Sequence, residues 1–357
     1  MRLALVTDAW FPQVNGVVRT LSTTVERLRA GGHEVTVISP DGFRTIPCPS
    51  YPEIRLALGA GRVIGGRLAA LDPDAIHVAT EGPLGLAARR WCLRNARRFT
   101  SAYHTQFPEY LRARLPVPLP AGYALMKWFH GAATRTLVAT PSLRVRLEGR
   151  GFRNLATWSR GVDGDLFRPR DKGFLNLRRP IWLYFGRVAV EKGIGEFLRL
   201  DLPGTKLVVG DGPARPALAR QHPDAVFTGP RHGEDLARHV AACDVFVFPS
   251  RTDTFGLVLL EAMACGVPVA AYPVTGPVDV VVPGVTGFLD ENLRAAAMAA
   301  LDLEPAASRD HALKYSWDAC TQQFVDSLVP ARSTGGRPSG DRKAAGTAQG
   351  GFRDAMP

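Results

Sequence analysis

The chain has 357 residues, of which 46% are hydrophobic and 22% are charged, values typical of a globular protein. A chain of this length is too long for one ordinary core and indicates two domains of roughly 150 residues each. Its formal charge of +11 is concentrated in residues 1–165, which hold 22 Lys and Arg against 12 Asp and Glu. We therefore expect the first half to meet an anionic surface or substrate.

The sequence also argues against a membrane span, a signal peptide, a cysteine metal site and a catalytic cysteine. No segment approaches the roughly 18 consecutive apolar residues of a membrane span, and Met1-Arg2 leads directly into a strand pattern that is too short and polar for a signal peptide. The five cysteines form no C-x-x-C pair or metal-ligand spacing, which indicates reduced thiols and argues against a catalytic cysteine. These features predict a cytoplasmic protein that is soluble or peripheral at the inner face of a membrane.

A strand, a loop and a helix open the chain. Apolar residues predict a buried strand over residues 3–7 and one apolar face on a helix over residues 17–30. The loop between them, residues 8–16, follows the carboxyl end of a strand, where doubly wound folds bind ligands. It lacks the G-x-G-x-x-G of a dinucleotide site. Gly16 at the helix start would still let backbone amides approach a phosphate, and a simple turn is the alternative.

The next strand pattern, PDAIHVATEGPLG, carries Glu81 at its carboxyl end, where this side chain would bind a ligand or cap the following helix. We expect that helix over residues 85–98, with Arg90, Arg94 and Arg97 on one face. Such a face is either a solvated cationic surface or a contact for an anionic membrane.

Three later segments complete the first half. The strand pattern in FTSAYHTQF ends at His104, and a lone histidine is more often structural than catalytic. Residues 115–129 combine prolines with aromatic residues, and they predict either a core helix or an interfacial element on the acceptor side. The charged, irregular residues 168–179 predict a linker between domains.

The second half begins with a strand that is followed by Arg187 and Lys192 on one loop before a helix. An arginine fork and a lysine point charge at this spacing suit the grip of a diphosphate, and a solvated basic loop is the alternative.

The segment DVFVFPSRTDTFGLVLLEAMACGVPV predicts a strand, a loop, a helix that begins near Gly256 and a second strand. The helix is apolar all round except at Glu261, so this buried carboxylate needs a partner, which bound ribose hydroxyls would provide. The backbone amides of Phe255, Gly256 and Leu257 at the helix start would bind phosphate or sugar oxygens. Asp253 stands eight positions before Glu261. The alternative is that Asp253 caps the helix and that Glu261 benefits from the helix dipole.

The segment PSRTDTFGLVLLEAMACGVPV resembles the nucleotide-sugar signature of the family 4 retaining glycosyltransferases, in which an acidic residue and a glutamate bracket seven residues. The segments DAWFPQVNGVVRT, YHT and GRVAVEKG resemble other motifs of this family in the same order, and the resemblance covers about residues 1–330. Within the family, the chain resembles GDP-mannose-dependent alpha-mannosyltransferases and related enzymes that act on membrane glycolipids. It departs from the commonest pattern at Asp253, where a glutamate usually stands.

The resemblance implies the GT-B fold, an α/β architecture of two doubly wound, Rossmann-like domains that face a cleft. Residues 1–167 would form the acceptor-side domain, and residues 180–313 would bind the nucleotide sugar. A helix over residues 314–330 would return to the first domain. The remaining residues, 331–357, have little apolar content and should be disordered.

The resemblance also assigns roles to single residues. His104 would line the face where the acceptor arrives, and Asp253 would position the sugar. Charge on the departing diphosphate would be stabilised by Arg187 and Lys192. The remaining assignments fall into two groups: donor-binding residues, Gly16, Gly229, Arg231, Phe255, Gly256, Leu257 and Glu261, and acceptor-side residues, Asp8 and Glu81. Such enzymes retain the anomeric configuration and usually need no metal, so we expect no cofactor.

We therefore expect a retaining glycosyltransferase that moves a hexose, mannose or a similar sugar, from GDP-mannose or a UDP-sugar to a membrane lipid or glycolipid. One alternative is a sugar-nucleotide epimerase of the same fold, which would convert the donor without an acceptor. The other is a nucleic-acid-binding protein. Only the charge suggests it, and because the basic residues lack interleaved aromatic residues, we expect no nucleic-acid partner.

Overall fold

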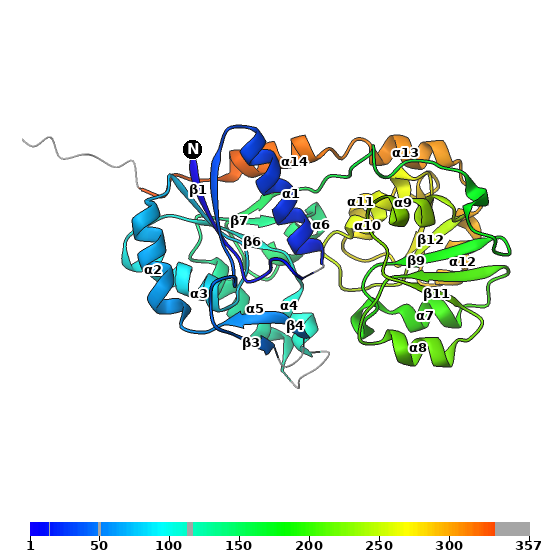
Figure 1. Ribbon diagram of the computed structural model, residues 1–357, viewed down its shortest axis with the longest axis horizontal. Helices are drawn as coiled ribbons and strands as arrows, with labels where there is room; N and C mark the ends of the chain where they lie inside the picture. Colours follow the sequence, from blue (N-terminus) through cyan, green and yellow to red (C-terminus); the bar gives the residue numbers. More distant parts are fainter. Residues whose placement is uncertain (14, 49–50, 113–116, 333–357) are drawn as a thin grey trace, which may run out of the picture.

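The computed structural model describes residues 1–13, 15–48, 51–112 and 117–332. Within these residues, each half of the chain forms a six-stranded parallel sheet covered by helices (Figure 1). The strand order is β2-β1-β5-β6-β7-β8 in the first half and β11-β10-β9-β12-β13-β14 in the second half. The predicted architecture of two doubly wound α/β domains is therefore confirmed.

The elements of the first domain follow the strand-helix alternation that the sequence predicts. In chain order they are β1 (Arg2–Val6), α1 (Gly16–Ala30), β2 (Glu34–Ile38), β3 (Thr45–Cys48), β4 (Tyr51–Ala57), α2 (Ala60–Leu71), β5 (Ala75–Val78), α3 (Pro83–Arg94), β6 (Thr100–Tyr103), α4 (Phe107–Arg112), α5 (Leu119–His130), β7 (Arg135–Val138), α6 (Pro141–Glu148) and β8 (Leu155–Thr157). The short strands β3 and β4 pair with each other in an antiparallel hairpin outside the main sheet.

The second domain follows a connection that contains a single helical turn, η1 (Lys172–Phe174). Its elements are β9 (Ile181–Phe185), η2 (Val190–Lys192), α7 (Ile194–Arg199), β10 (Thr205–Val209), α8 (Arg215–Gln221), β11 (Val226–Gly229), α9 (Gly233–Ala241), β12 (Val245–Phe248), α10 (Leu257–Ala264), β13 (Val269–Ala271), α11 (Pro277–Val280), β14 (Gly287–Leu289), α12 (Leu293–Ala300) and α13 (Pro305–Ala312). The last helix, α14 (Trp317–Ser327), lies beyond this domain.

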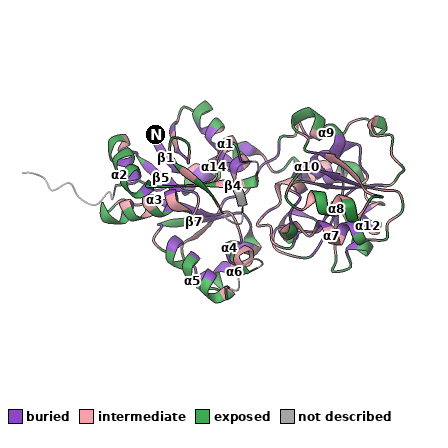
Figure 2. Cartoon of the chain, turned by 60° about the horizontal axis from the view of Figure 1, so that its bottom comes forward, coloured by how far each residue is buried: buried purple, intermediate pink, exposed green. Residues whose placement is uncertain are grey.

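Buried residues line both sheets and the inner faces of the helices that cover them (Figure 2). Helix α1 shows how the sequence specifies one such face. Asn15 begins it by accepting hydrogen bonds from the amides of Val17 and Val18. Leu21 and Leu28 then fall on one side at helical spacing and are buried against the sheet. None of the described helices is long and apolar enough to cross a bilayer.

The prediction of a helix over residues 85–98 is wrong at both ends. Helix α3 starts at Pro83, whose fixed backbone angle suits a first turn, and it stops at Arg94. Ala96 has a positive φ of 47°, so the chain leaves the helix before Arg97. Arg97 forms an ion pair with Asp72 at 3.0 Å and is not part of the cationic helix face that the sequence predicts.

Helix α14 returns from the second domain and packs against α1 of the first. Its Trp317 and Phe324 belong to the same buried cluster as Leu3 and Trp158. Beyond the helix, the amide of Ala331 donates to the carbonyl of Asp74 at 2.7 Å, which ties this segment to the amino-terminal edge of the first sheet. Most of the tail for which disorder was predicted, residues 333–357, lies outside the described residues.

Candidate active site

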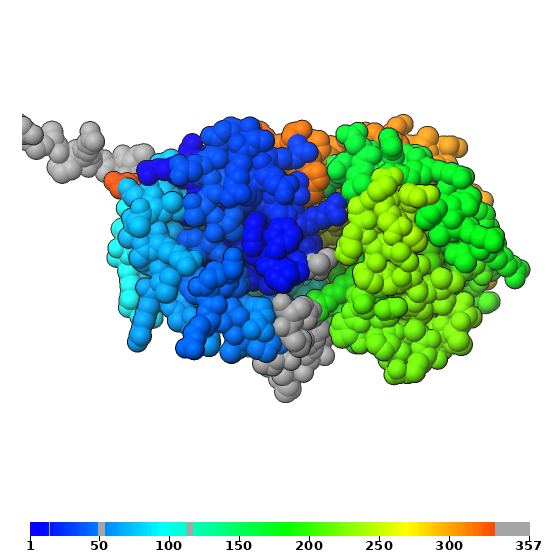
Figure 3. Space-filling model, viewed as in Figure 1, coloured from blue at the N-terminus to red at the C-terminus, as the bar shows by residue number. Residues whose placement is uncertain are grey.

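A loop of the second domain, residues 250–256, follows β12 and lies against the first domain. Thr254 Oγ1 donates to the carbonyl of His104 at 2.7 Å. Gln106 Nε2 donates to the carbonyl of Asp253 at 3.2 Å. These contacts define the domain interface, and Figure 3 shows the two domains meeting at the molecular surface.

Five predicted site residues follow neighbouring strands, because parallel strands of one sheet end at the same edge. On the first sheet, Asp8, Glu81 and His104 follow the neighbouring strands β1, β5 and β6. On the second sheet, Arg187 and Asp253 follow the neighbouring strands β9 and β12. The site is therefore built from two strand edges that face each other.

Lys192 and Asp253 form a close ion pair in the second domain. The distance from Lys192 Nζ to Asp253 Oδ1 is 2.6 Å, and less than a fifth of either side chain is exposed. Burial alone would lower the pKa of Lys192, but the Asp253 carboxylate and two nearby tyrosine hydroxyls raise it well above its ordinary value. The lysine is therefore a permanent cation, as the grip of a diphosphate requires.

Asp253 does not cap helix α10. The cap residue is Gly256, whose φ of 82° places it in the left-handed region, and no side chain caps the helix there. Asp253 Oδ2 is buried and has no hydrogen-bond partner among the described residues. The capping alternative is therefore wrong. The adjacent Phe255 directs its side chain into the core of the second domain.

Arg187 follows β9 on the same loop as Lys192. The hydroxyl of Tyr184 donates to the carbonyl of Arg187 at 2.7 Å, and the loop then forms the η2 turn that ends at Lys192. The two predicted cations therefore belong to one short, hydrogen-bonded loop at the interface.

Glu261 of helix α10 faces the first domain and pairs with Arg19 of helix α1. The distance from Arg19 Nη1 to Glu261 Oε1 is 3.3 Å, and only 8% of the glutamate side chain is exposed. Burial raises the pKa of Glu261, and the arginine opposes this effect. Nearby, a Cβ on Gly16 would lie 3.7 Å from Leu257 Cδ1. The predicted donor-binding residues Gly16, Leu257 and Glu261 thus lie at the interface between the two domains. No sequence motif marked Arg19 as their partner.

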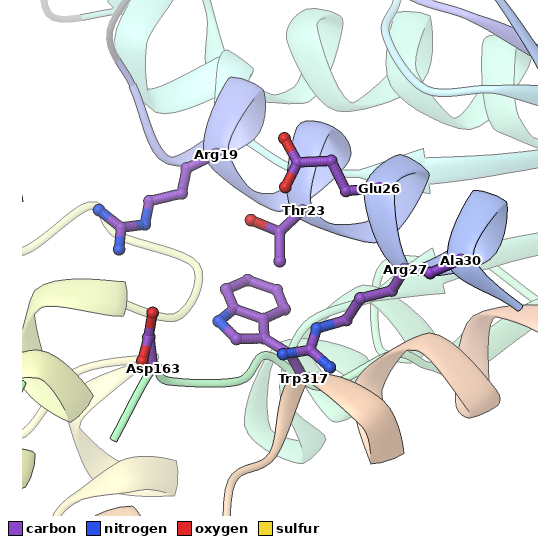
Figure 4. Close-up of a pocket in the computed structure, with 7 residues that line it drawn as sticks. All are labelled: Arg19, Thr23, Glu26, Arg27, Ala30, Asp163 and Trp317. Atoms are coloured by element: carbon purple, nitrogen blue, oxygen red, sulfur yellow. The ribbon is translucent and has the colours of Figure 1, made fainter. Parts of the chain in front are cut away.

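A pocket of about 330 Å³ opens beside this ion pair, between α1 and α14 (Figure 4). Its lining includes two arginines and two carboxylates, so it offers no excess of one charge to a ligand. The lining residues are Arg19, Thr23, Glu26, Arg27, Ala30, Asp163 and Trp317. In Figure 4 the Arg19 side chain extends away from the other lining residues towards the second domain.

Asp8 is buried and holds the start of helix α3. Its Oδ1 accepts from the amide of Leu84 at 2.9 Å, and its Oδ2 accepts from Thr80 Oγ1 at 2.9 Å and from the amide of Gly85 at 3.2 Å. Burial raises the pKa of Asp8, and these hydrogen bonds lower it. A Cβ on Gly82 would lie 2.4 Å from Asp8 Cγ, so the close approach requires glycine there. An acceptor contact for Asp8 stays a prediction.

Glu81 does not cap helix α3, because Asp8, from another loop, accepts hydrogen bonds from the amides of the first turn. Instead Glu81 Oε1 lies 3.0 Å from Nε2 of His130, a buried residue of helix α5. The other ring nitrogen of His130 lies 2.9 Å from Ser101 Oγ, so Glu81 is anchored through the core of the first domain. One fifth of the Glu81 side chain remains exposed, and its contact with an acceptor stays a prediction.

His104 is held on two sides. Its carbonyl accepts from Thr254, as described above, and its Nδ1 lies 3.3 Å from Nη2 of Arg160. Its Nε2 is buried without a hydrogen-bond partner among the described residues. Sequence reasoning did not find Arg160, because no motif within its own segment marked it.

Gly229 and Arg231 lie at the end of β11, away from the central ion pairs. Gly229 has a φ of 75°, and Arg231 pairs with Asp235 at 3.2 Å on the surface. Binding of the donor by these residues stays a prediction. Among the residues that the structure describes, no three histidine, cysteine, aspartate or glutamate side chains converge in a way that would hold a metal ion.

Two family models match the chain. One described as Glycosyltransferase Family 4 matches residues 14–166, and one described as Glycosyl transferases group 1 matches residues 179–303. Together they cover both domains, including Gly16, Lys192 and Glu261.

Named relatives and a solved structure are similar over most of the chain. GDP-mannose-dependent alpha-mannosyltransferase from Mycobacterium tuberculosis is 33% identical over 316 residues, which cover 81% of this chain and 83% of the relative. Sulfoquinovosyl transferase SQD2 from Arabidopsis thaliana is 30% identical over 92% of this chain and 74% of the relative. The structure of sucrose-phosphate synthase from Thermosynechococcus elongatus has a TM-score of 0.72 and 22% identity over 91% of this chain and 97% of that chain.

Proposed function

The chain belongs to the family 4 glycosyltransferases, enzymes that transfer sugar from a nucleotide sugar, and from this premise we propose that it is a retaining mannosyltransferase. Its donor is GDP-mannose, and its acceptor is a lipid or glycolipid at an anionic membrane surface. Two observations support the donor site: the buried ion pair of Lys192 with Asp253, and the buried Glu261, which pairs with Arg19 of the first domain.

These side chains suit the parts of a nucleotide diphosphate sugar. The loop with Arg187 and Lys192 supplies cations for the diphosphate, and Glu261 supplies a buried acceptor for ribose hydroxyls. Asp253 Oδ2, which lacks a partner among the described residues, supplies an acceptor for a sugar hydroxyl. The relatives support different sugars, because one is named for mannose and another for sulfoquinovose. We favour mannose because the relative named for it has the higher identity of the two.

A mixed apolar and cationic surface of the first domain supports the lipid acceptor. On helix α3, Leu86, Arg90, Leu93 and Arg94 are exposed and share one face at helical spacing. Helix α5 lies beside it, where the Arg89 guanidinium stacks 3.9 Å from the ring centre of a Trp128 that is 53% exposed. Figure 2 shows exposed residues along these helices. Leucine, tryptophan and arginine together suit the boundary between lipid headgroups and acyl chains.

Incubation of the full chain with GDP-mannose and a bacterial lipid extract tests the proposal. We expect a mannosylated lipid of retained configuration by mass spectrometry and NMR, and thermal stabilisation by GDP-mannose. A ligand at about 100 times its Kd stabilises a protein by about 2.7 kcal/mol. Conversion of the donor without lipid would favour an epimerase instead. The absence of stabilisation by GDP-, UDP- and ADP-sugars would remove the donor site.

The membrane surface has its own test, because each arginine near an anionic surface contributes about 1 kcal/mol of binding. The full chain should sediment with anionic vesicles and not with neutral ones, and Arg90→Ala with Arg94→Ala should weaken this binding. Arg178→Ala with Arg220→Ala removes the same charge from exposed sites of the second domain and serves as the control. Equal loss of binding in both double variants would assign the attraction to net charge alone.

A further inference from the structure

Arg160 is a buried cation whose partners are neutral. Only 5% of the residue is exposed. Its Nη1 donates to the carbonyls of Trp158 at 2.6 Å and Ser159 at 2.8 Å, and its guanidinium lies 4.6 Å from the centre of the Trp158 ring. Its Nη2 donates to His104 Nδ1 at 3.3 Å. No carboxylate of the described residues pairs with it, so the buried charge is a cost that the fold alone does not explain.

The contact with Arg160 decides which nitrogen of His104 carries the proton. A guanidinium has donors and no acceptor, so His104 Nδ1 must accept and must be unprotonated. The proton of the neutral ring is therefore on Nε2. Burial, the Arg160 charge and the nearby His77 and His130 all lower the pKa of His104 well below its ordinary value. His104 thus stays neutral at physiological pH and does not act as a proton donor to a leaving group.

The Nε2–H group of His104 is a donor without an acceptor. Nε2 is buried and has no partner among the described residues. Leaving such a group unpaired destabilises the protein, and a ligand oxygen would satisfy it. The carbonyl of the same residue accepts from Thr254, the neighbour of Asp253, so His104 lies where the sugar of the donor is proposed to bind.

The backbone around Arg160 is held between the first domain and the segment that leads into α14. The amide of Trp158 donates to the carbonyl of Val138 at 2.8 Å, and the amide of Val162 donates to the carbonyl of Tyr315 at 2.9 Å. A Cβ on Gly161 would lie 2.4 Å from the amide nitrogen of Trp317. The backbone of Arg160 is therefore fixed in place, so its guanidinium can hold the His104 ring in one orientation.

We propose that Arg160 is a positioning residue for sugar transfer, which holds His104 as a neutral ring with its Nε2–H offered to a hydroxyl of the donor sugar. This inference rests on the proposed function only for the identity of the acceptor of that hydrogen bond. The coupling between the two side chains is a property of the protein without substrate.

Nitrogen NMR of the full chain with ¹⁵N-labelled histidine tests the coupling. We expect His104 to give the spectrum of a neutral ring protonated at Nε2, without change from mildly acidic to mildly basic pH. In Arg160→Met the ring should show the other tautomer or a protonation step, and Arg160→Lys should restore part of the wild-type spectrum. Arg135→Met, which removes an arginine bonded to carbonyls of α14, is the control. An unchanged His104 spectrum in Arg160→Met would overturn the proposal, whatever the enzyme transfers.

Kinetics give the second readout. Loss of one preorganised donor lowers kcat by about 10² to 10³. We expect such a fall in Arg160→Met with little change in KM for the donor. His104→Gln keeps a donor near the Nε2 position and should retain more activity than His104→Asn, whose amide mimics Nδ1. If Arg160→Met fails to fold, this pair of histidine variants decides, and equal activity of the two would overturn the proposal.

Discussion

The two strand edges at the domain interface hold their polar side chains in opposite ways. In the first domain, Asp8 is satisfied by backbone amides and a threonine, and His104 is oriented by a guanidinium of its own domain. In the second domain, Lys192 is paired with Asp253, and Glu261 is paired with a cation that belongs to the other domain. The side chains of the first edge are therefore held within their own domain, whereas on the second edge the proposed donor would replace ion pairs that already exist.

This difference assigns different tasks to the two domains. An ion pair between potential ligand groups lowers the cost of holding charges in a site that contains no donor. A donor can then replace the pairing of Lys192 by its phosphates and the pairing of Glu261 by its hydroxyls. Among the described residues, Asp8 and His104 at the edge of the first domain have no ion-pair partner that a donor must replace, so they can hold the reacting groups in a fixed geometry.

The largest expected effect comes from removing the lysine that must change partners. Lys192→Ala should reduce kcat by about 10² to 10³, equivalent to about 2.7 to 4 kcal/mol of transition-state stabilisation. Steady-state kinetics at saturating donor and acceptor measure this effect. Lys206→Ala is the control, because Lys206 donates to the carbonyl of Leu198 in the same domain, away from the interface. Turnover near that of the wild type would place Lys192 outside the reaction.

Two substitutions of Asp253 test separately whether the site needs its charge and whether it needs the length of its side chain. Asp253→Asn should lose much of the rate, because the carboxylate pairs with Lys192 and offers its other oxygen to the sugar. Asp253→Glu should also suffer, since displacement of a reacting group by about 1 Å can cost about a hundredfold in rate. Asp253→Asn should also lower the unfolding temperature, because it leaves the buried Lys192 charge without its carboxylate. Full activity of Asp253→Asn would remove this residue from the site.

Acid should destabilise the first domain through the buried His77. Burial lowers the pKa of His77 to about 3, below that of a histidine in the unfolded chain, about 6.5. Below about pH 6.5 the His77 side chain is therefore protonated in the unfolded chain and neutral in the folded chain. The free energy of unfolding then falls as the pH drops, by at most about 1.4 kcal/mol per pH unit for this group. Urea unfolding of the wild type and His77→Asn at about pH 7.5 and about pH 5.5 checks this. The same pH dependence in both proteins would contradict it.

The smallest effect concerns the ion pair that joins the two edges. Arg19→Met leaves Glu261 without its cation and should lower the stability of the donor-free protein by about 1 kcal/mol, since 40% of the arginine side chain is exposed to solvent. Stabilisation by GDP-mannose should then be larger than in the wild type, because ribose hydroxyls meet an unpaired acceptor. Thermal unfolding with and without donor measures both. Arg27→Met, on the same helix, is the control, and identical results for both variants would exclude the exchange of partners.

Local patterns in the sequence were sufficient for the fold and for part of the site. Apolar periodicity predicted α1, and one charged residue in an otherwise apolar segment marked Glu261 on the buried α10. The partners of the site residues were not predictable in this way. Arg160 meets His104 across 56 positions, and His130 meets Glu81 across 49, so no repeat within a segment contains either pair. The end of α3 was missed because arginines continue the helical pattern beyond the turn at Ala96.

The return of α14 to the first domain determines when that domain can finish folding during synthesis. Trp158 Nε1 donates to the carbonyl of Cys320, a residue made 162 positions later, and Phe324 packs against the same ring. The first domain therefore leaves the ribosome with part of its core uncovered, and the second domain emerges in full before the covering helix does. Completion of the first domain is a late and long-range folding step. A chain truncated before Trp317 would keep all the site residues and would still lack the surface that holds Arg160 in place.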